Sequence, residues 1–204
     1  MPRFNLFSIK HMSPQKEKSI QYRQMTPEDF DKIITLGNIV HGDGYLTPTN
    51  IKEWYAKGLK NDINSSFVAY DGERLVGFRI TYSAQQWTID QWATPAKWRV
   101  PASEVSYFKC NTVDENYRGY GIGSRLLKDS MQALKQQGAK AGVSHLWIQS
   151  PGNSAVKYFT KCGGELVQEH PDKWHEESKN GYDCILCGFD CHCSAAEMII
   201  YFDE

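Results

Sequence analysis

The chain has 204 residues, of which 41% are hydrophobic and 13% aromatic, enough to bury the core of one domain. Its 23 basic and 24 acidic residues leave a net charge of −1, which argues against nucleic acid as a partner. No apolar run approaches the ~20 residues of a membrane helix, so we expect no membrane partner. Residues 1–18 carry scattered apolar positions without a continuous hydrophobic stretch, so we expect an N-terminal extension, not a secretory signal. A single cytoplasmic domain over residues 19–204 is the expectation.

Strand and helix signals alternate along this domain. A strand is predicted at 19–25, and helices at 26–40 and 49–59, because Thr26-Pro27 and Pro48 are typical helix starts. Alternating residues on either side of Asp71-Gly72 predict a hairpin. Further strands are predicted at 105–113, 143–149, 165–169 and 197–202, and further helices after Gly121 and Asn153. The pattern predicts an α/β fold, a mixed sheet covered by helices.

The most informative segment is the glycine-rich loop that links the strand at 105–113 to the following helix. Glycines at 119, 121 and 123 allow a tight turn, and the unpaired N–H groups of a helix start attract phosphate. The glycine spacing does not fit the dinucleotide fingerprint, and the chain has no Gly-Lys-Ser/Thr nucleotide loop. A ligand with a diphosphate is therefore the first hypothesis, and a purely structural turn is the alternative.

The pattern Arg118-x-x-Gly121-x-Gly123 after a β-rich run resembles the acetyl-coenzyme A loop of the GNAT superfamily of N-acetyltransferases. A second segment resembles the same family, with an Asn, an Ala two residues on, an aromatic six on, a Lys eight on and a Gly ten on. Here these are Asn153, Ala155, Phe159, Lys161 and Gly163. The resemblance covers residues 20–202 and implies a GNAT-like fold, a central, mostly antiparallel sheet flanked by helices.

The resemblance also implies where the cosubstrate acetyl-CoA is held. The strand residues Asn111, Thr112 and Val113 would pair with the pantetheine arm and aim a backbone N–H at the thioester carbonyl. The loop would hold the pyrophosphate through Arg118, Gly119, Tyr120, Gly121, Ile122, Gly123 and Ser124. Asn153, Phe159 and Lys161 would complete the site. Arg125, Lys128 and Lys161 are candidate partners of the remaining phosphate, and each is equally explained as a solvated helix residue.

Catalytic residues follow less directly. The family often carries a Tyr that protonates the departing thiolate at the position of Phe159, and Tyr158 is one residue away. Adjacent helix positions differ by about 100°, so Tyr158 is either the acid or a packing residue. The amine must lose a proton to a carboxylate or histidine. Glu104, at the head of the central strand, is the first candidate for this base, followed by Asp114 and His41.

Two loops are expected to shape the site of the amine acceptor. Residues 41–48 form a Gly-rich link between the first two helices. Residues 85–103 form a long connection that carries Trp87, Trp92 and Trp98. Loops of this length are usually functional or disordered, and three tryptophans argue against disorder. They form either a small satellite core or the wall of an acceptor pocket.

Four of the six cysteines fall within ten residues, in a Cys-rich hairpin near the C-terminus that spans Cys184, Cys187, Cys191 and Cys193. Four thiolates can hold a structural zinc ion, and reduced thiols in a tight turn are the alternative. His192 lies between two of the cysteines, so a set of three Cys and one His is a close variant.

These observations predict an acetyl-CoA-dependent N-acetyltransferase acting on a primary amine of a small molecule or peptide. Neither the acceptor nor the oligomeric state follows from the sequence, and a homodimer is left open. A non-catalytic acyl-CoA-binding or metal-responsive module on the same fold is the alternative, favoured by Phe159 and by the cysteine cluster.

Overall fold

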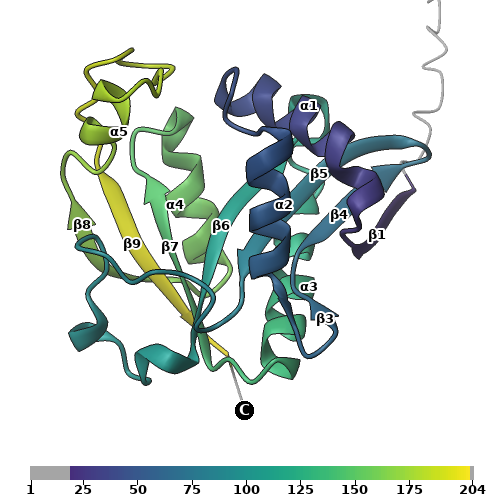
Figure 1. Cartoon of the computed structure of the whole chain (residues 1–204), viewed down its shortest axis with the longest axis horizontal. Helices are drawn as coiled ribbons and strands as arrows, with labels where there is room; N and C mark the ends of the chain where they lie inside the picture. The colour runs from purple at the N-terminus through teal and green to yellow at the C-terminus, as the bar shows by residue number, and fades with distance from the viewer. Residues whose placement is uncertain (1–18, 203–204) are drawn as a thin grey trace, which may run out of the picture.

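The computed structural model describes residues 19–202, so the expected extension at 1–18 lies outside the described residues. A seven-stranded sheet with the order β1-β4-β5-β6-β7-β9-β8 dominates the fold (Figure 1). Within this sheet only β6 and β7 run parallel. The mixed, mostly antiparallel sheet predicted from the sequence is confirmed. Its strands are β1 (Ile20–Gln24), β4 (Phe67–Asp71), β5 (Arg74–Tyr82), β6 (Val105–Val113), β7 (Ala141–Trp147), β8 (Glu165–His170) and β9 (Ala195–Tyr201).

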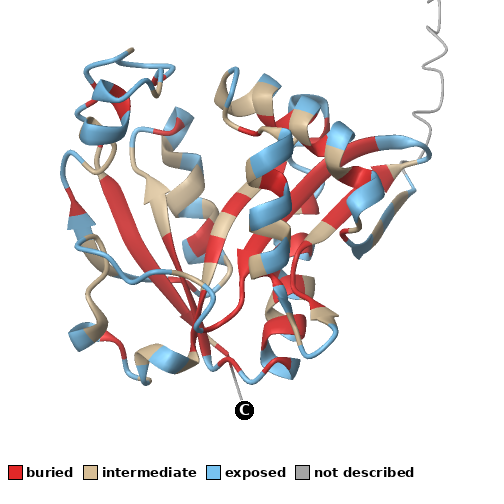
Figure 2. Ribbon diagram, in the orientation of Figure 1, coloured by how far each residue is buried: buried red, intermediate tan, exposed pale blue. Residues whose placement is uncertain are grey.

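Helices cover both faces of the sheet. Phe78 and Ile80 of β5 pack with α1 (Phe30–His41) and α2 (Pro48–Lys57), whereas Val76 packs with α3 (Ile122–Gln136) on the opposite face. Val76 changes face because it is the extra residue of a β-bulge, since Leu75 pairs with Tyr70 and Gly77 with Ala69. The short helix α4 (Ser154–Lys161) shares a core cluster with α3. Figure 2 shows the buried residues concentrated along the central strands, between these two layers. Within the described part of the chain, no helix has the length and apolarity needed to cross a lipid bilayer.

The helix α3 forms where the sequence predicts it because glycines define both ends. Gly121 precedes it with φ 76°, and Gly138 follows it with φ 91°, both in the left-handed region that favours glycine. Ile122, Leu126 and Leu134 lie on its buried face. Each such side chain contributes roughly 1.5–3 kcal/mol when it is removed from water. The apolar stripe therefore fixes α3 against β5 and orients its N-terminus toward the end of β6.

Several short elements escaped the sequence analysis. The hairpin β2 (Leu59–Lys60) and β3 (Ile63–Asn64) turns through Asn61 and Asp62, both with positive φ. The one-turn helix α5 (His175–Lys179) lies between β8 and β9. Neither is long enough to produce a hydrophobic period. Strand β7 also begins earlier than predicted and includes Gly142. This residue lies against the Phe108 ring, where a Cβ has no room.

Candidate functional site

The central feature of the site is the separation of strands β6 and β7. The two strands pair only where Val105–Tyr107 face Ala141–Val143, and beyond Tyr107 they diverge (Figure 1). The pairing of β6 with β5 shifts register at this point, since Ile80 faces Cys110 while Thr81 faces Phe108. Lys109 is thus the extra residue of a β-bulge, which bends the strand. The edge of β6 from Asn111 to Val113 is left unpaired by β7 and can pair with a ligand.

The glycine-rich loop begins directly at this free edge. Asp114 closes the turn after β6 by accepting hydrogen bonds from the Asn116 N–H at 2.9 Å and from Arg74 at 2.6 Å. Gly119 has φ 84° and Gly121 φ 76°. The first helical hydrogen bond of α3 runs from the Arg125 N–H to the Gly121 carbonyl at 3.0 Å. The N–H groups at the start of α3 therefore have no carbonyl partner within the helix and form an anion site.

Buried polar groups lie beneath the loop. The Tyr158 hydroxyl donates to the Gly123 carbonyl at 2.8 Å and accepts from Arg79 Nη2 at 2.9 Å. Arg79, on β5, is only 2% exposed, and its guanidinium lies 5.2 Å from the centre of the Phe108 ring. A Cβ on Gly123 would lie 3.2 Å from the Asn111 amide nitrogen, so a larger residue here would require the Asn111 side chain to shift.

Several of these buried groups have unsatisfied hydrogen-bonding atoms. The side-chain oxygens of Asn111 and Asn153 and the Nε of Arg79 are buried without a hydrogen-bond partner in the structure. Such atoms are rare in native proteins and indicate a water molecule or a ligand. A long ligand that carries amides, as pantetheine does, supplies the donors and acceptors that these atoms need. The residues present therefore fit coenzyme A.

A second group of polar residues lies on the face of the sheet that α1 and α2 cover. His41 Nε2 lies 2.8 Å from Thr112 Oγ1 and 3.8 Å from Cys110 Sγ. The His41 ring also packs on Tyr45, with centroids 4.4 Å apart. Burial would raise the pKa of the Cys110 thiol, but the charge of His41 and hydrogen bonds from His41, Thr112 and Tyr45 outweigh it and lower the pKa to about 7. A titratable pair thus lies at the bulge of β6.

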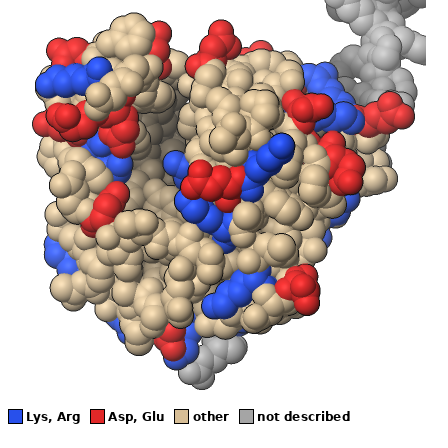
Figure 3. Space-filling view, viewed as in Figure 1, with Lys and Arg blue, Asp and Glu red and all other residues tan. Residues whose placement is uncertain are grey.

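Aromatic side chains surround this second group. Trp87, from the long 85–103 loop, stacks on Tyr107 with centroids 4.9 Å apart, and its indole N–H donates to the Val105 carbonyl at 2.9 Å. Lys109 lies with its ammonium 4.6 Å from the centre of the Trp54 ring, and burial lowers its pKa. Figure 3 shows the surface hollowed between the α1–α2 side of the molecule and the segment around α5, with basic side chains in the hollow.

A buried carboxylate fixes the 85–103 loop to the sheet. Glu197 of β9 accepts hydrogen bonds from the Thr94 N–H at 3.0 Å, Trp98 Nε1 at 2.9 Å and His170 Nε2 at 2.9 Å, and also from the Thr94 hydroxyl. Burial would raise its pKa, but these hydrogen bonds outweigh burial and lower it. Although His145, His170 and Glu197 lie close enough to share a metal ion, the Glu197 oxygens are already saturated with donors. The cluster is a structural anchor.

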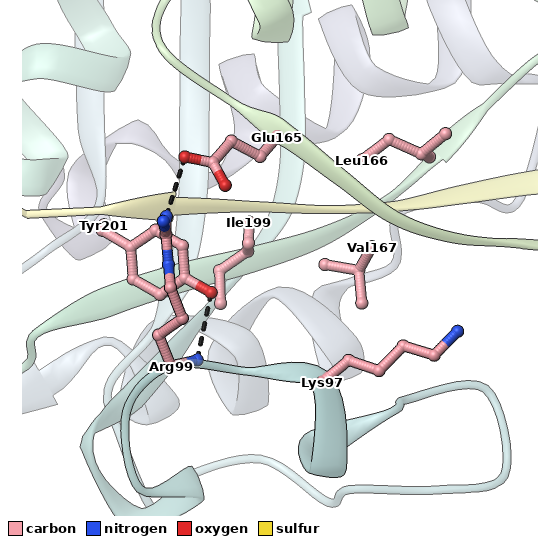
Figure 4. Close-up of a pocket in the computed structure, with 7 residues that line it drawn as sticks. All are labelled: Lys97, Arg99, Glu165, Leu166, Val167, Ile199 and Tyr201. Carbon is pink, nitrogen blue, oxygen red and sulfur yellow. Dashed lines mark hydrogen bonds and ion pairs between the residues drawn. The ribbon is translucent and has the colours of Figure 1, made fainter.

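The same loop is also held at Arg99, the residue after Trp98. Arg99 lies 3.8 Å from the centre of the Tyr201 ring and pairs with Glu165 at 2.7 Å, in a shallow depression beside β8 and β9 (Figure 4). This depression is lined by sheet-edge residues and lies away from the glycine-rich loop. The contacts of Arg99 in this depression hold the 85–103 loop against β8 and β9.

Known proteins share this architecture. The model of the acetyltransferase (GNAT) family matches residues 32–164, which include the bulged strand and the glycine-rich loop. The chain belongs to the GNAT acetyltransferase family. The uncharacterized N-acetyltransferase MJ1207 of Methanocaldococcus jannaschii is 24% identical over 154 residues, which are 72% of this chain and 62% of that protein. The chain thus spans less than two thirds of this relative.

Solved structures show the same fold. The yncA protein of Salmonella typhimurium, determined with its cofactor acetyl-CoA, has a TM-score of 0.65 at 14% identity and covers 91% of this chain and 95% of its own. A ribosomal-protein-alanine N-acetyltransferase from Brucella melitensis has a TM-score of 0.63 at 14% identity and covers 89% of this chain and 99% of its own. The GNAT-like fold predicted from two motifs is confirmed.

Within this GNAT domain, some predicted site residues are not where the sequence analysis placed them. Phe159 is 1% exposed and packs edge-on against Phe108, so its side chain lies in the core. Its burial turns the neighbouring Tyr158 toward the glycine-rich loop. Asn153 occupies the N-cap position of α4, but its side chain makes no capping bond, and Ser150 Oγ accepts from the Ala155 N–H at 3.2 Å instead. Lys161 is exposed near the end of α4.

The first candidate for the base also lies elsewhere. Glu104 precedes β6 at the end where β6 and β7 still pair, and its carboxylate binds Lys140 at 3.0 Å. At about 3.3 Å per residue, a strand of this length separates Glu104 from the glycine-rich loop by roughly 30 Å. The Asp114 carboxylate already accepts a hydrogen bond from the Asn116 N–H and forms an ion pair with Arg74. Of the three candidates, only His41 lies beside the bulge.

Two residues of the site carry no sequence signal. Arg79 lies within β5 and Cys110 within β6, and neither belongs to a motif. Their roles depend on the register of β5 against β6 and on the bulge between them. The one hint in the sequence is an arginine inside a predicted strand. If such an arginine is buried it needs a partner, since arginine is almost never fully buried without one.

Proposed function

We propose that this protein transfers an acetyl group from acetyl-CoA to a primary amine of a small molecule or a peptide. The observation that carries the proposal is the separation of β6 from β7 beside a glycine-rich helix start, together with unsatisfied buried polar atoms on Asn111, Arg79 and Asn153. A cofactor that combines a diphosphate with an amide-rich arm matches both halves of this site. The family to which the chain belongs supports the same activity.

Binding of acetyl-CoA is assigned to two segments. The N–H groups of Ile122, Gly123 and Ser124, with the left-handed turn at Gly119 and Gly121, would hold the pyrophosphate. The free edge of β6 from Asn111 to Val113 would pair with the pantetheine arm and offer the N–H that polarises the thioester carbonyl. Arg125 pairs with Asp129 at 2.9 Å, which makes Lys128 and Lys161 the better candidates for the remaining phosphate.

Release of the thiolate is assigned to Tyr158, with Arg79 as its positioning residue. Burial is the largest effect on the Tyr158 hydroxyl and raises its pKa, so the group stays protonated near neutral pH. Arg79 donates to this hydroxyl and, as an arginine, keeps its charge. A cation beside the donor stabilises the negative charge that forms when the thioester bond breaks.

Removal of the amine proton is assigned to His41. It lies at the end of α1 beside the bulge, on the face where the aromatic wall of Trp87, Tyr107 and Trp54 gathers. An imidazole nitrogen can accept the proton of an amine that lies within hydrogen-bond reach. Thr112 holds the ring through Nε2. The proton acceptor and the polarising strand therefore lie next to each other.

The acceptor class remains a choice between two chemistries. The aromatic wall suits an amine with an apolar or aromatic portion, and the near-neutral net charge selects neither class. The solved neighbour from Brucella melitensis is named for alanine of ribosomal proteins, which makes peptide N-termini a natural part of any substrate panel. Small amines form the other part of the panel.

The test is a panel of small amines, peptide N-termini and peptide lysines, with release of free thiol from acetyl-CoA followed for each. We expect amine-dependent thiol release with at least one class, above a control without amine. The alternative is a non-catalytic acyl-CoA-binding or metal-responsive module, favoured by the phenylalanine at the usual position of the acid and by the cysteine cluster. Tight acetyl-CoA binding without thiol release for every amine would support that alternative and refute the transferase.

A further inference from the structure

The segment between β8 and β9 contains a feature that acetyl transfer does not use. It includes α5 and the turn of four cysteines, and it lies beyond residue 164, where the family match ends. In the structure, the sulfur atoms of Cys184, Cys187, Cys191 and Cys193 all lie within 4.8 Å of one another. We propose that these four cysteines form a structural zinc site.

The spacing of the sulfur atoms fits a tetrahedral ion. Zinc–sulfur bonds of about 2.3 Å in a tetrahedron place the sulfur atoms about 3.8 Å apart. The sulfur atoms of Cys187 and Cys193 lie 3.6 Å apart, too far for a disulfide bond, and all four cysteines are free thiols. Four thiolates fill a tetrahedral coordination sphere and leave no position for water, so the ion would be structural.

The backbone of the turn is shaped for such an ion. The N–H groups of Cys187 and Gly188 both donate to the Cys184 carbonyl, at 3.2 Å and 2.7 Å, which folds the first two cysteines onto one side. Gly188 has φ 66°, a conformation that favours glycine directly after the second cysteine. The Cys193 N–H points at the Cys191 sulfur at 3.5 Å. A thiolate bound to a metal gains from such N–H donors.

In this turn most of the cysteines are buried and the large apolar side chains are exposed. Cys184, Cys191 and Cys193 are at most 5% exposed, whereas Ile185, Leu186 and Phe189 are 59–61% exposed. The apolar side chains that would normally hold a turn together therefore face solvent, and three of the four cysteines occupy its interior, while Cys187 is exposed. Trp147, Trp174 and Tyr182 pack around the sulfur cluster. The Trp147 indole N–H is buried without a hydrogen-bond partner in the structure.

The structure also decides between the two ligand sets that the sequence allows. His192 stacks on His175 with ring centroids 4.4 Å apart, and its Nδ1 pairs with Asp172 at 2.8 Å. Its side chain is 60% exposed and belongs to a separate group with His175 and Asp190. Four cysteines, without His192, are therefore the proposed ligands.

The proposed zinc site would stabilise the fold of the 171–194 segment. In these residues the one helix is five residues long and the only strand pairing is the single bridge between Cys184 and Gly188. Isolated helices of this length are not stable in water. Metal binding to ligands that are brought together only on folding contributes its free energy to that folding. The proposal stands on these residues alone and does not depend on acetyl transfer.

Metal analysis of the full chain purified without chelator is the first test. We expect one zinc per chain, and X-ray absorption should show sulfur neighbours at about 2.3 Å. Replacement by cobalt should give the visible bands of tetrahedral thiolate coordination, a readout that needs no variant. A metal content near zero with four titratable thiols in this segment, or disulfides between these cysteines, would overturn the proposal.

Variants define the ligand set. Cys187→Ser should lose zinc to a competing chelator that the unmodified protein withstands, whereas Cys162→Ser, outside the cluster, should keep it. His192→Ala should also keep the full metal content, and loss of metal in this variant would overturn the four-cysteine set. Hydrogen exchange should rise in residues 171–194 on chelation and stay unchanged in β5 and β6. Equal exchange in all segments before and after chelation would contradict a structural role.

Discussion

Replacing Glu197 with glutamine or leucine tests how the 85–103 loop is held against the sheet. Each Glu197 oxygen accepts two hydrogen bonds. Oε1 takes the Thr94 N–H and Trp98 Nε1, and Oε2 takes the Thr94 hydroxyl and His170 Nε2. In Glu197→Gln the amide nitrogen can replace Oε2, because the Thr94 hydroxyl and the neutral His170 ring can each reverse from donor to acceptor.

The two substitutions therefore differ in magnitude. Glutamine keeps the hydrogen bonds and loses only their charge assistance, which we expect to cost about 2 kcal/mol of unfolding free energy. Leucine leaves the Thr94 N–H and Trp98 Nε1–H buried without an acceptor, at roughly 1–3 kcal/mol each, and removes the bond to His170 as well. We expect about 4–6 kcal/mol in total for Glu197→Leu.

Urea unfolding and thermal melting measure both values. For a chain of this size, each kcal/mol lowers Tm by about 2–4 °C, so Glu197→Gln should melt roughly 4–8 °C below the unmodified protein. Glu165→Gln is the matched control, since that carboxylate lies in an exposed pair with Arg99 and should change stability by at most about 1 kcal/mol. Equal losses for glutamine and leucine at position 197 would refute the hydrogen-bond argument.

The pH dependence gives a second check on the same carboxylate. The pKa of Glu197 is lower in the folded protein than its ordinary value near ~4.3, so its contribution is complete above that value and is lost as pH falls through the folded pKa. The stability difference between the unmodified protein and Glu197→Gln should therefore shrink below about pH 4. A difference that stays constant down to acid unfolding would mean that the carboxylate is not ionised in the fold.

The remaining predictions concern the cofactor and the chemistry. Gly121→Glu should abolish coenzyme A binding in calorimetry because it places a carboxylate at the anion site, whereas Gly138→Glu, which also replaces a left-handed glycine in open space, should bind normally; binding by both would remove the loop assignment. Tyr158→Phe should lower kcat by roughly 10²–10⁴-fold with little change in coenzyme A affinity, and near-normal turnover would make Tyr158 a packing residue. His41→Ala should lower kcat to a similar extent. It should also raise the pKa of Cys110 from about 7, because burial of the thiol then acts without the opposing charge of His41. A thiol titration that shows no rise would contradict the coupling of His41 to Cys110.

The sequence alone was enough to predict the family, the glycine-rich loop and most of the elements. These signals are local: glycines at 121 and 138 delimit α3, and apolar residues recur along it at helical spacing. Strand β6 has the bounds predicted for it, Val105–Val113. The four cysteines lie within one short segment, so their proximity needs no knowledge of distant contacts.

Tertiary structure decided which side chains meet in the site, because that depends on register. Glu104 lies directly before β6, at the end opposite to the free edge of that strand, so the sequence could not exclude it as a base. The bulge at Lys109 brings Cys110 onto the face of His41, and the burial of Phe159 against Phe108 turns Tyr158 toward Gly123. A shift of one residue in a strand or a helix exchanges one face for another, and only packing between distant segments fixes that shift.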